Sequence, residues 1–155
     1  MPTLLHTRDL GGLAEWYASD PASWPVRPRF DSASRWYARL AAPSDHEVWL
    51  LTWLPGQGTD LHDHGGAAGA FTILDGQLTE ETPTVGPDVA LRPRAYGAGA
   101  TRRFGAQHVH RMVNSGSVPA VSVHVYSPVL TRMTRYTVED GALRIIAVEE
   151  AGRDW

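Results

Sequence analysis

The sequence predicts an all-β fold, either a barrel or a two-sheet jelly roll, preceded by short helices. From about residue 44 onward, short segments rich in Val, Leu, Trp, Thr and Phe alternate with Gly, Pro and Asp-Gly turn signals, at the spacing of antiparallel strands. Before that point, two segments have the apolar spacing of short helices. The chain has 155 residues, enough for one domain with a real core. We therefore expect a single domain over 1–155, with a helical preface over 1–43 and the barrel over 44–150.

Two helices are expected in the preface. The first follows Asp9, whose carboxylate is a suitable cap, and ends before Pro21. Its apolar residues recur at helical spacing: Leu10, Leu13, Trp16 and Tyr17. The second is the segment "DSASRWYARLAA", with Asp31 or Ser32 as its cap and an end before Pro43. Its apolar side would carry Trp36, Tyr37 and Leu40.

The strand-bearing segments follow in order along the rest of the chain. They are 46–53, 58–64, 70–76, 76–82, 89–97, 101–115, 120–128, 132–140 and 142–150. Two of the turns between them contain Asp-Gly, in "ILDGQ" and "EDGAL". Because Asp-Gly suits the positive dihedral angles of a two-residue turn, both segments predict tight hairpins.

Composition narrows the class of function. The net charge is −3, so a basic nucleic-acid surface is not supported, and we expect a small-molecule substrate. The chain has no cysteine, so any metal must be bound by nitrogen and oxygen atoms. The first residues, "MPTLLHTRDL", lack the basic and apolar regions of a signal peptide, and no apolar segment approaches membrane-spanning length. We therefore expect a cytoplasmic protein that does not bind membranes.

Histidines are the chemically informative residues. His62 and His64 lie two residues apart in "LHDHGG", and side chains two apart on a strand point to the same face. His108 and His110 alternate in the same way in "HVHRMVN", and His124 lies in "SVHVYS". Two imidazoles on one face favour a metal site, although a solvent-facing or hydrogen-bonded pair has the same spacing. A barrel lets residues from distant strands converge on its interior.

The residues around these histidines resemble the two motifs of the cupin superfamily, whose double-stranded β-helix barrel supplies metal ligands from facing strands. "GQGTDLHDH" and "HRMVN" carry the resemblance. It implies that His62, His64 and His110 are metal ligands. Many cupins place a glutamate ligand five residues after the second histidine, where this chain has Gly69. The resulting three-histidine site, with open positions, suits Fe(II), although its geometry would also permit Zn(II).

Within this superfamily the chain resembles cysteine dioxygenase, through "RWYARL", "GQGTDLHDH", "ILDGQLTE" and "HRMVNSGSVPAVSVHVYSP". The resemblance implies a thiol dioxygenase with an Fe(II) cofactor, which adds both atoms of O2 to the sulfur of L-cysteine and gives cysteine sulfinate. It also implies that Arg39 and Tyr37 bind the substrate, with Arg39 clamping its carboxylate.

The same resemblance implies catalytic roles beside the metal for Ser122, His124 and Tyr126. These three residues alternate, so on a strand they would all face inward. Animal members of the family cross-link a cysteine to this tyrosine. The position of that cysteine is Gly69 here, so Tyr126 is expected as a free phenol, as in bacterial relatives.

Several alternatives stay open at this stage. The substrate could be another small thiol such as 3-mercaptopropionate, whose enzymes tend to have glutamine in place of the arginine, and other arginines could compete with Arg39. The chain could also be a non-catalytic metal-binding cupin, or a zinc hydrolase or isomerase. A hydrolase would want a carboxylate base, but Asp63 points away from the histidines on a regular strand. His108 is not expected as a ligand, because a fourth ligand would close a needed position. We expect a monomer or a weak homodimer.

Overall fold

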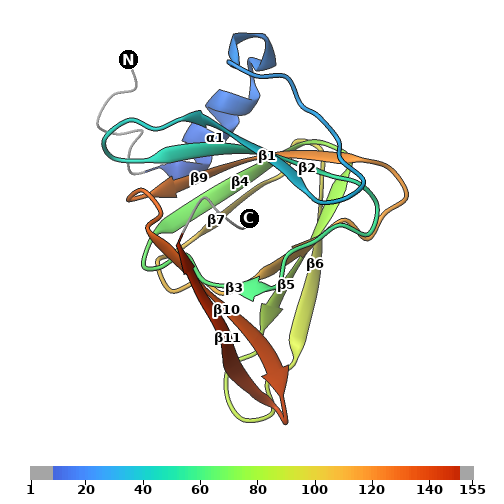
Figure 1. The fold of residues 1–155 in the computed structure, drawn as a ribbon, viewed down its shortest axis with the longest axis vertical. Helices are drawn as coiled ribbons and strands as arrows, with labels where there is room; N and C mark the ends of the chain where they lie inside the picture. Colours follow the sequence, from blue (N-terminus) through green and yellow to red (C-terminus); the bar gives the residue numbers. More distant parts are fainter. Residues whose placement is uncertain (1–8, 151–155) are drawn as a thin grey trace.

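The computed structural model describes residues 9–150, and Figure 1 shows a short helix above a set of β-sheets. Residues 1–8 and 151–155 of the expected domain lie outside this description. The elements, in order, are α1 (Leu10–Ala18), the 3-10 turn η1 (Pro21–Ser23), β1 (Trp36–Ala41), β2 (Glu47–Trp53), β3 (Leu61–His62), β4 (Ala68–Asp75), β5 (Gln77–Pro83), β6 (Leu91–Gly97), β7 (Thr101–Phe104), β8 (Arg111–Val113), β9 (Ala120–Ser127), β10 (Arg132–Glu139) and β11 (Ala142–Glu150).

Two walls of strands enclose the core. One wall is a five-stranded sheet in the order β1-β2-β9-β4-β7. The other consists of two three-stranded sheets, β11-β10-β3 and β6-β5-β8. Isolated antiparallel bridges from Gly58 to Val113 and from His62 to His110 join these two smaller sheets across β3 and β8. In Figure 1 the five-stranded sheet lies above and the other strands lie below it. The predicted all-β class with a helical start is confirmed.

Side-chain alternation on β2 and β9 sorts the apolar residues into two clusters. The inner cluster lies between the walls and includes Trp49, Leu51, Trp53, Phe71, Ile73, Leu78, Tyr96, Phe104, Met112, Tyr126 and Met133. The outer cluster lies between the five-stranded sheet and α1 and includes Leu10, Leu13, Ala14, Trp24, Val48, Leu50, Val121, Val123 and Val125. Every residue of β2 is buried, because both faces of this strand are covered. The alternation also sends residues 122, 124 and 126 of β9 into the barrel.

The first predicted helix is confirmed and the second is wrong. Asp9 caps α1 by accepting a hydrogen bond of 3.0 Å from the Gly12 amide. The segment expected as the second helix is strand β1, which pairs antiparallel with β2 from Trp36–Thr52 onward. Its apolar residues fit a period of two as well as a helical one: Trp36 and Leu40 pack on the outer cluster and Tyr37 on the inner one. Pairing with β2 decides between the two, so the barrel begins at Trp36 and the preface is shorter than expected.

The two Asp-Gly turns behave differently. Asp140 and Gly141 have φ of 50° and 73°, and they connect the paired residues Glu139 and Ala142 of β10 and β11. This confirms one two-residue hairpin. Gly76, with φ of 73°, instead lies between β4 and β5, which belong to different sheets. The hairpin predicted there is wrong, because the chain turns a corner from one wall to the other.

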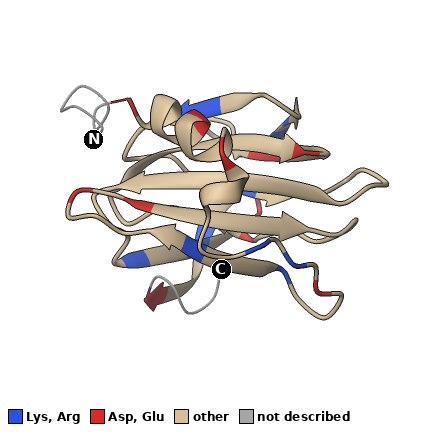
Figure 2. Cartoon of the chain, turned by 90° about the horizontal axis from the view of Figure 1, so that it is seen from above, with Lys and Arg blue, Asp and Glu red and all other residues tan. Residues whose placement is uncertain are grey.

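Charged residues are distributed without large single-sign segments. Figure 2 shows acidic and arginine positions interspersed over this view of the molecule. The net charge is −3. Among the described residues, no helix combines the length and the apolar character that a membrane crossing requires.

Candidate metal centre

Three buried histidines meet where the two smaller sheets join. His62 ends β3, His64 follows two residues later, and His110 immediately precedes β8. One nitrogen from each ring lies within 4.8 Å of the others. The backbones of His62 and His110 exchange two hydrogen bonds, of 2.9 and 3.1 Å, so the isolated bridge fixes the spacing of these two residues. The convergence predicted from the sequence is therefore confirmed.

The ring nitrogens of this cluster are arranged as metal ligands. The Nδ1 of His62 lies 2.8 Å from the carbonyl oxygen of Asp60, and the Nδ1 of His110 lies 2.7 Å from the Glu80 carboxylate. Because a carbonyl or carboxylate only accepts, each Nδ1 carries the proton and each Nε2 is left with a free lone pair. Both ring nitrogens of His64 are buried without a hydrogen-bond partner among the described residues. A metal ion would satisfy this orphaned imidazole, so the residues fit a metal.

The surroundings of the three histidines keep their imidazoles neutral. Burial lowers the pKa of His62 and of His64 well below the ordinary value, and the nearby His110 lowers both further. Burial also lowers the pKa of His110, although its hydrogen bond to Glu80 opposes that effect. Neutral imidazoles are the species that bind metal. Three neutral nitrogen ligands would leave a divalent ion its full charge and open positions for other ligands.

Asp63, which lies between His62 and His64, connects this segment to β10. Its carboxylate accepts hydrogen bonds from the amide of Thr134 at 3.0 Å, from the hydroxyl of Tyr136 at 2.8 Å and from the amide of Gly65 at 3.1 Å. Asp63 therefore points toward β10 and away from the histidines, as the sequence predicted. It anchors the turn that carries His64.

Aromatic rings enclose His64. Its ring stacks on Phe104, with centroids 4.8 Å apart, and on Tyr126, with centroids 5.3 Å apart. Phe104 also fills the space beside Gly69, where a Cβ atom would lie 2.5 Å from the phenyl Cζ. The position at which a cupin glutamate or a cross-linking cysteine would stand is therefore already occupied by a ring.

The inward-facing residues of β9 form a hydrogen-bonded chain with β2. Trp53 donates its indole N–H to the Ser122 hydroxyl at 2.9 Å, and Ser122 Oγ lies 2.7 Å from His124 Nε2. The rings of His124 and Tyr126 stack with centroids 6.4 Å apart. Burial lowers the pKa of His124 to about 3, so its imidazole is neutral. Burial, with the nearby Glu47, raises the pKa of Tyr126, so its phenol keeps its proton. All three predicted residues thus line the same interior as the histidines.

A second arginine lies near the predicted Arg39: Arg35 immediately precedes β1, the strand that carries Arg39. Tyr37 packs against the inner cluster, and Arg39 is exposed. Arg35 is two residues before Tyr37 and half-buried: its guanidinium stacks over Trp53 at 5.2 Å, and its Nε donates to the carbonyl of Gly58 at 3.1 Å. Its Nη1 is buried without a hydrogen-bond partner in the described part of the chain. Burial, with the nearby Arg135, lowers the pKa of Arg35 to about 10, so the side chain stays cationic at neutral pH.

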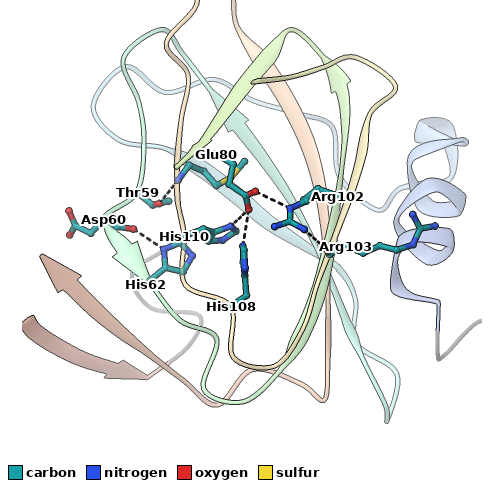
Figure 3. A network of polar contacts seen from close by, with 9 residues as sticks. Thr59, Asp60, His62, Glu80, Arg102, Arg103, His108 and His110 are labelled. Atoms are coloured by element: carbon teal, nitrogen blue, oxygen red, sulfur yellow. Dashed lines mark hydrogen bonds and ion pairs between the residues drawn. The ribbon is translucent and has the colours of Figure 1, made fainter. Parts of the chain in front are cut away.

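Sequence reasoning missed Glu80, a buried carboxylate beside the three histidines. Glu80 of β5 accepts hydrogen bonds from His110, from His108 at 2.9 Å and from Arg102 at 3.0 Å (Figure 3). His108 is thereby turned toward Glu80 and is not part of the three-histidine cluster. A charged residue at an inward position of a strand was the available signal, since buried glutamate is rare without partners.

Comparison with known proteins identifies the family to which this chain belongs. The family model described as cysteine dioxygenase type I matches residues 4–139. The chain belongs to this family. Cysteine dioxygenase type 1 of Danio rerio and that of Homo sapiens are each 28% identical to the chain over 134 residues, which cover 80% of the chain and 66% of each relative. The chain thus spans just under two thirds of the length of these relatives.

A solved structure agrees on the fold. An uncharacterized protein with a double-stranded β-helix domain from Klebsiella pneumoniae is 18% identical, with a TM-score of 0.57, and the match covers 84% of this chain and 94% of that one. The chain therefore has the cupin fold that the sequence motifs predicted. Because it has no cysteine, the cross-link to Tyr126 cannot form.

Proposed function

We propose that this chain is a thiol dioxygenase that adds both atoms of O2 to the sulfur of L-cysteine and gives cysteine sulfinate. The observation that carries the proposal is the buried cluster of His62, His64 and His110, with both nitrogens of His64 unpaired, in a chain of the cysteine dioxygenase type I family. The sulfur supplies all the electrons that reduce O2, and both oxygen atoms end on it, so no external reductant is needed.

The three histidines would hold Fe(II), and the metal would supply the redox chemistry that lets O2 react with a thiolate. The protein's contribution is positioning. Stacking on Phe104 and Tyr126 fixes the ring of His64. The protonated phenol of Tyr126 can donate a hydrogen bond to the substrate, and the Trp53–Ser122–His124 chain holds the β9 side of the pocket rigid. The aromatic inner cluster keeps water away from the reacting sulfur.

Two arginines are candidates for the substrate carboxylate. Arg39 is the residue that matches the family motif, and Tyr37 beside it would contribute a hydroxyl. Arg35 is supported by its Nη1, which is buried without a hydrogen-bond partner in the described residues, since a carboxylate would satisfy that donor. It also lines a surface cleft of about 310 Å³ together with Thr59, Asp60 and Arg135. We propose Arg35 as the main carboxylate ligand and Arg39 as the competing assignment.

The proposal is tested by oxygen uptake. Protein loaded anaerobically with Fe(II) is offered L-cysteine and 3-mercaptopropionate in parallel, and products are identified by mass. We expect cysteine-dependent uptake and a product two oxygen atoms heavier. A His62→Ala variant, treated identically, controls for free iron.

Each other outcome leads to a definite alternative. A preference for 3-mercaptopropionate would support the proposed iron site and show that L-cysteine is not the preferred substrate. No uptake with either thiol, by protein shown to contain iron, would reject the dioxygenase and leave a non-catalytic metal-binding cupin.

A further inference from the structure

Glu80 is the most heavily hydrogen-bonded buried acid near the metal centre. Its Oε2 accepts from His110 Nδ1 at 2.7 Å and from His108 Nε2 at 2.9 Å, and its Oε1 accepts from Arg102 Nε at 3.0 Å. Arg102 in turn donates to the carbonyl of Arg103 at 2.7 Å. Figure 3 shows the carboxylate pointing between the two histidines, with Arg102 on its other side.

This group is too close-packed to be a second metal site, although Glu80, His108 and His110 together have the residue types for one. Donor atoms around a tetrahedral zinc ion lie about 3.3 Å apart, given metal–ligand distances of about 2.0–2.1 Å. The two contacts to Oε2 are 2.7 and 2.9 Å, which are hydrogen-bond distances. His110 also has one nitrogen for each of the two groups: Nδ1 faces Glu80, and Nε2 is left for the cluster with His62 and His64. The carboxylate therefore acts on the metal centre through His110.

We propose that Glu80 is a positioning residue that fixes the proton of His110 on Nδ1 and its Nε2 toward the metal, with Arg102 and His108 holding the carboxylate. The inference rests on the three-histidine metal site, and not on the identity of the thiol. Glu80 supplies from outside the ligand sphere the negative charge that many cupins place directly on the metal at the position of Gly69. The hydrogen bond to Glu80 would make the imidazole of His110 a stronger donor to a bound ion.

The first test measures metal affinity. Glu80→Gln keeps the shape of the side chain and removes its charge. We expect the Co(II) dissociation constant, measured by competition with a chelator, to rise about 10- to 100-fold, with an altered visible spectrum of the bound Co(II). The matched control is Glu81→Gln, on the opposite face of the same strand, where Glu81 pairs with Arg111 at 3.3 Å. An unchanged affinity and spectrum in Glu80→Gln would overturn the proposal.

The second test uses the unmodified protein, so it stands even where the variant does not fold. Nitrogen NMR of the metal-free protein with labelled histidine identifies which ring nitrogen of His110 carries the proton. We expect Nδ1, with the same assignment after Zn(II) is added. A proton on Nε2 in the metal-free protein would overturn the proposal.

Neither measurement involves a thiol or O2. If Co(II) binding depends on Glu80, yet the Fe(II)-loaded protein consumes no O2 with either thiol, the proposed dioxygenase activity is rejected and the positioning role is supported. The experiments can therefore reject the positioning role of Glu80 and the dioxygenase activity independently of each other.

Discussion

At the scale of single residues, Gly69 and Phe104 form a complementary pair beside the metal centre. A Cβ atom on residue 69 would lie 2.5 Å from the Phe104 ring and 2.9 Å from the carbonyl oxygen of Val125. The ring can move, but the Val125 carbonyl belongs to the central strand β9. Glycine at 69 therefore leaves the space that the Phe104 ring, which stacks on His64, occupies.

The close contact between position 69 and Phe104 predicts the effect of placing a cysteine at position 69. Gly69→Cys should destabilise the fold by about 2 kcal/mol, because overpacking a filled interior costs about 1–3 kcal/mol, and no thioether to Tyr126 should form. Urea denaturation and intact mass measure the two effects. Gly97→Ala is the control, because a Cβ atom there meets no other atom within 4 Å. A Gly69→Cys protein as stable as the unmodified one would contradict the prediction.

Arg35 and Arg39, which lie just before β1 and within it, are expected to affect catalysis differently when substituted. A carboxylate hydrogen-bonded to a charged partner gains about 1.5–3 kcal/mol, so Arg35→Gln should raise KM for L-cysteine roughly 10- to 100-fold. It should have little effect on cysteamine, a thiol without the carboxylate. The comparison uses Arg39→Gln, with the exposed Arg144→Gln as control. A large KM effect in Arg39→Gln alone would return the role to Arg39.

At the scale of elements, the corner between β4 and β5 positions the ligand network. Gly76 carries the chain from the five-stranded sheet to the sheet that holds Glu80. Its φ of 73° is a left-handed conformation, and a Cβ atom there would lie 2.5 Å from the carbonyl oxygen of Pro119. Both backbone conformation and lack of space therefore require glycine.

Two glycine variants separate these two requirements. Gly86 has a φ of 104°, but a Cβ atom there meets no other atom within 4 Å. Gly86→Ala should therefore cost only the backbone strain, about 1–2 kcal/mol. Gly76→Ala should cost distinctly more, because the Pro119 carbonyl must also move. Thermal unfolding of both variants measures the difference, and equal losses of stability would show that the contact at Gly76 is relieved without cost.

At the scale of the whole molecule, the metal centre connects parts that are distant in sequence. His62 belongs to the sheet of β10 and β11, whereas His110 adjoins the sheet of β5 and β6. A bound ion would tie these sheets together through side chains, in addition to the backbone bridges Gly58–Val113 and His62–His110. Metal binding should therefore stabilise the whole barrel.

Added Co(II) should raise the melting temperature. At a free concentration 100 times the dissociation constant, binding stabilises the folded state by about 2.7 kcal/mol, which for a domain of this size is about 5 to 10 °C. Differential scanning fluorimetry with and without Co(II) measures the shift. His64→Ala should abolish it, whereas His46→Ala, outside the cluster, should retain it. An equal shift in His64→Ala would place the metal elsewhere.

The sequence by itself determined the features that depend on local pattern. Strand alternation placed Ser122, His124 and Tyr126 on one face, and the resemblance of the histidine segments to the cupin motifs selected His62, His64 and His110 as the expected metal ligands. The turn chemistry of Asp140-Gly141 also fixed a hairpin. Each of these follows from residue types and from periods of a few residues, which require no knowledge of distant partners.

The tertiary structure decided what depends on a partner far along the chain. β1 is a strand and not a helix because β2 offers it an edge, and the Asp75-Gly76 turn is a corner because its two strands pair with different sheets. Glu80 reaches His110 only because β5 lies beside β8. The stacking of Arg35 over Trp53, with Arg39 left exposed, is likewise a property of packing. Desolvation and hydrogen bonding act between residues that are close in space. The roles of Glu80 and Arg35 therefore depend on the folded structure and cannot be derived from the local sequence.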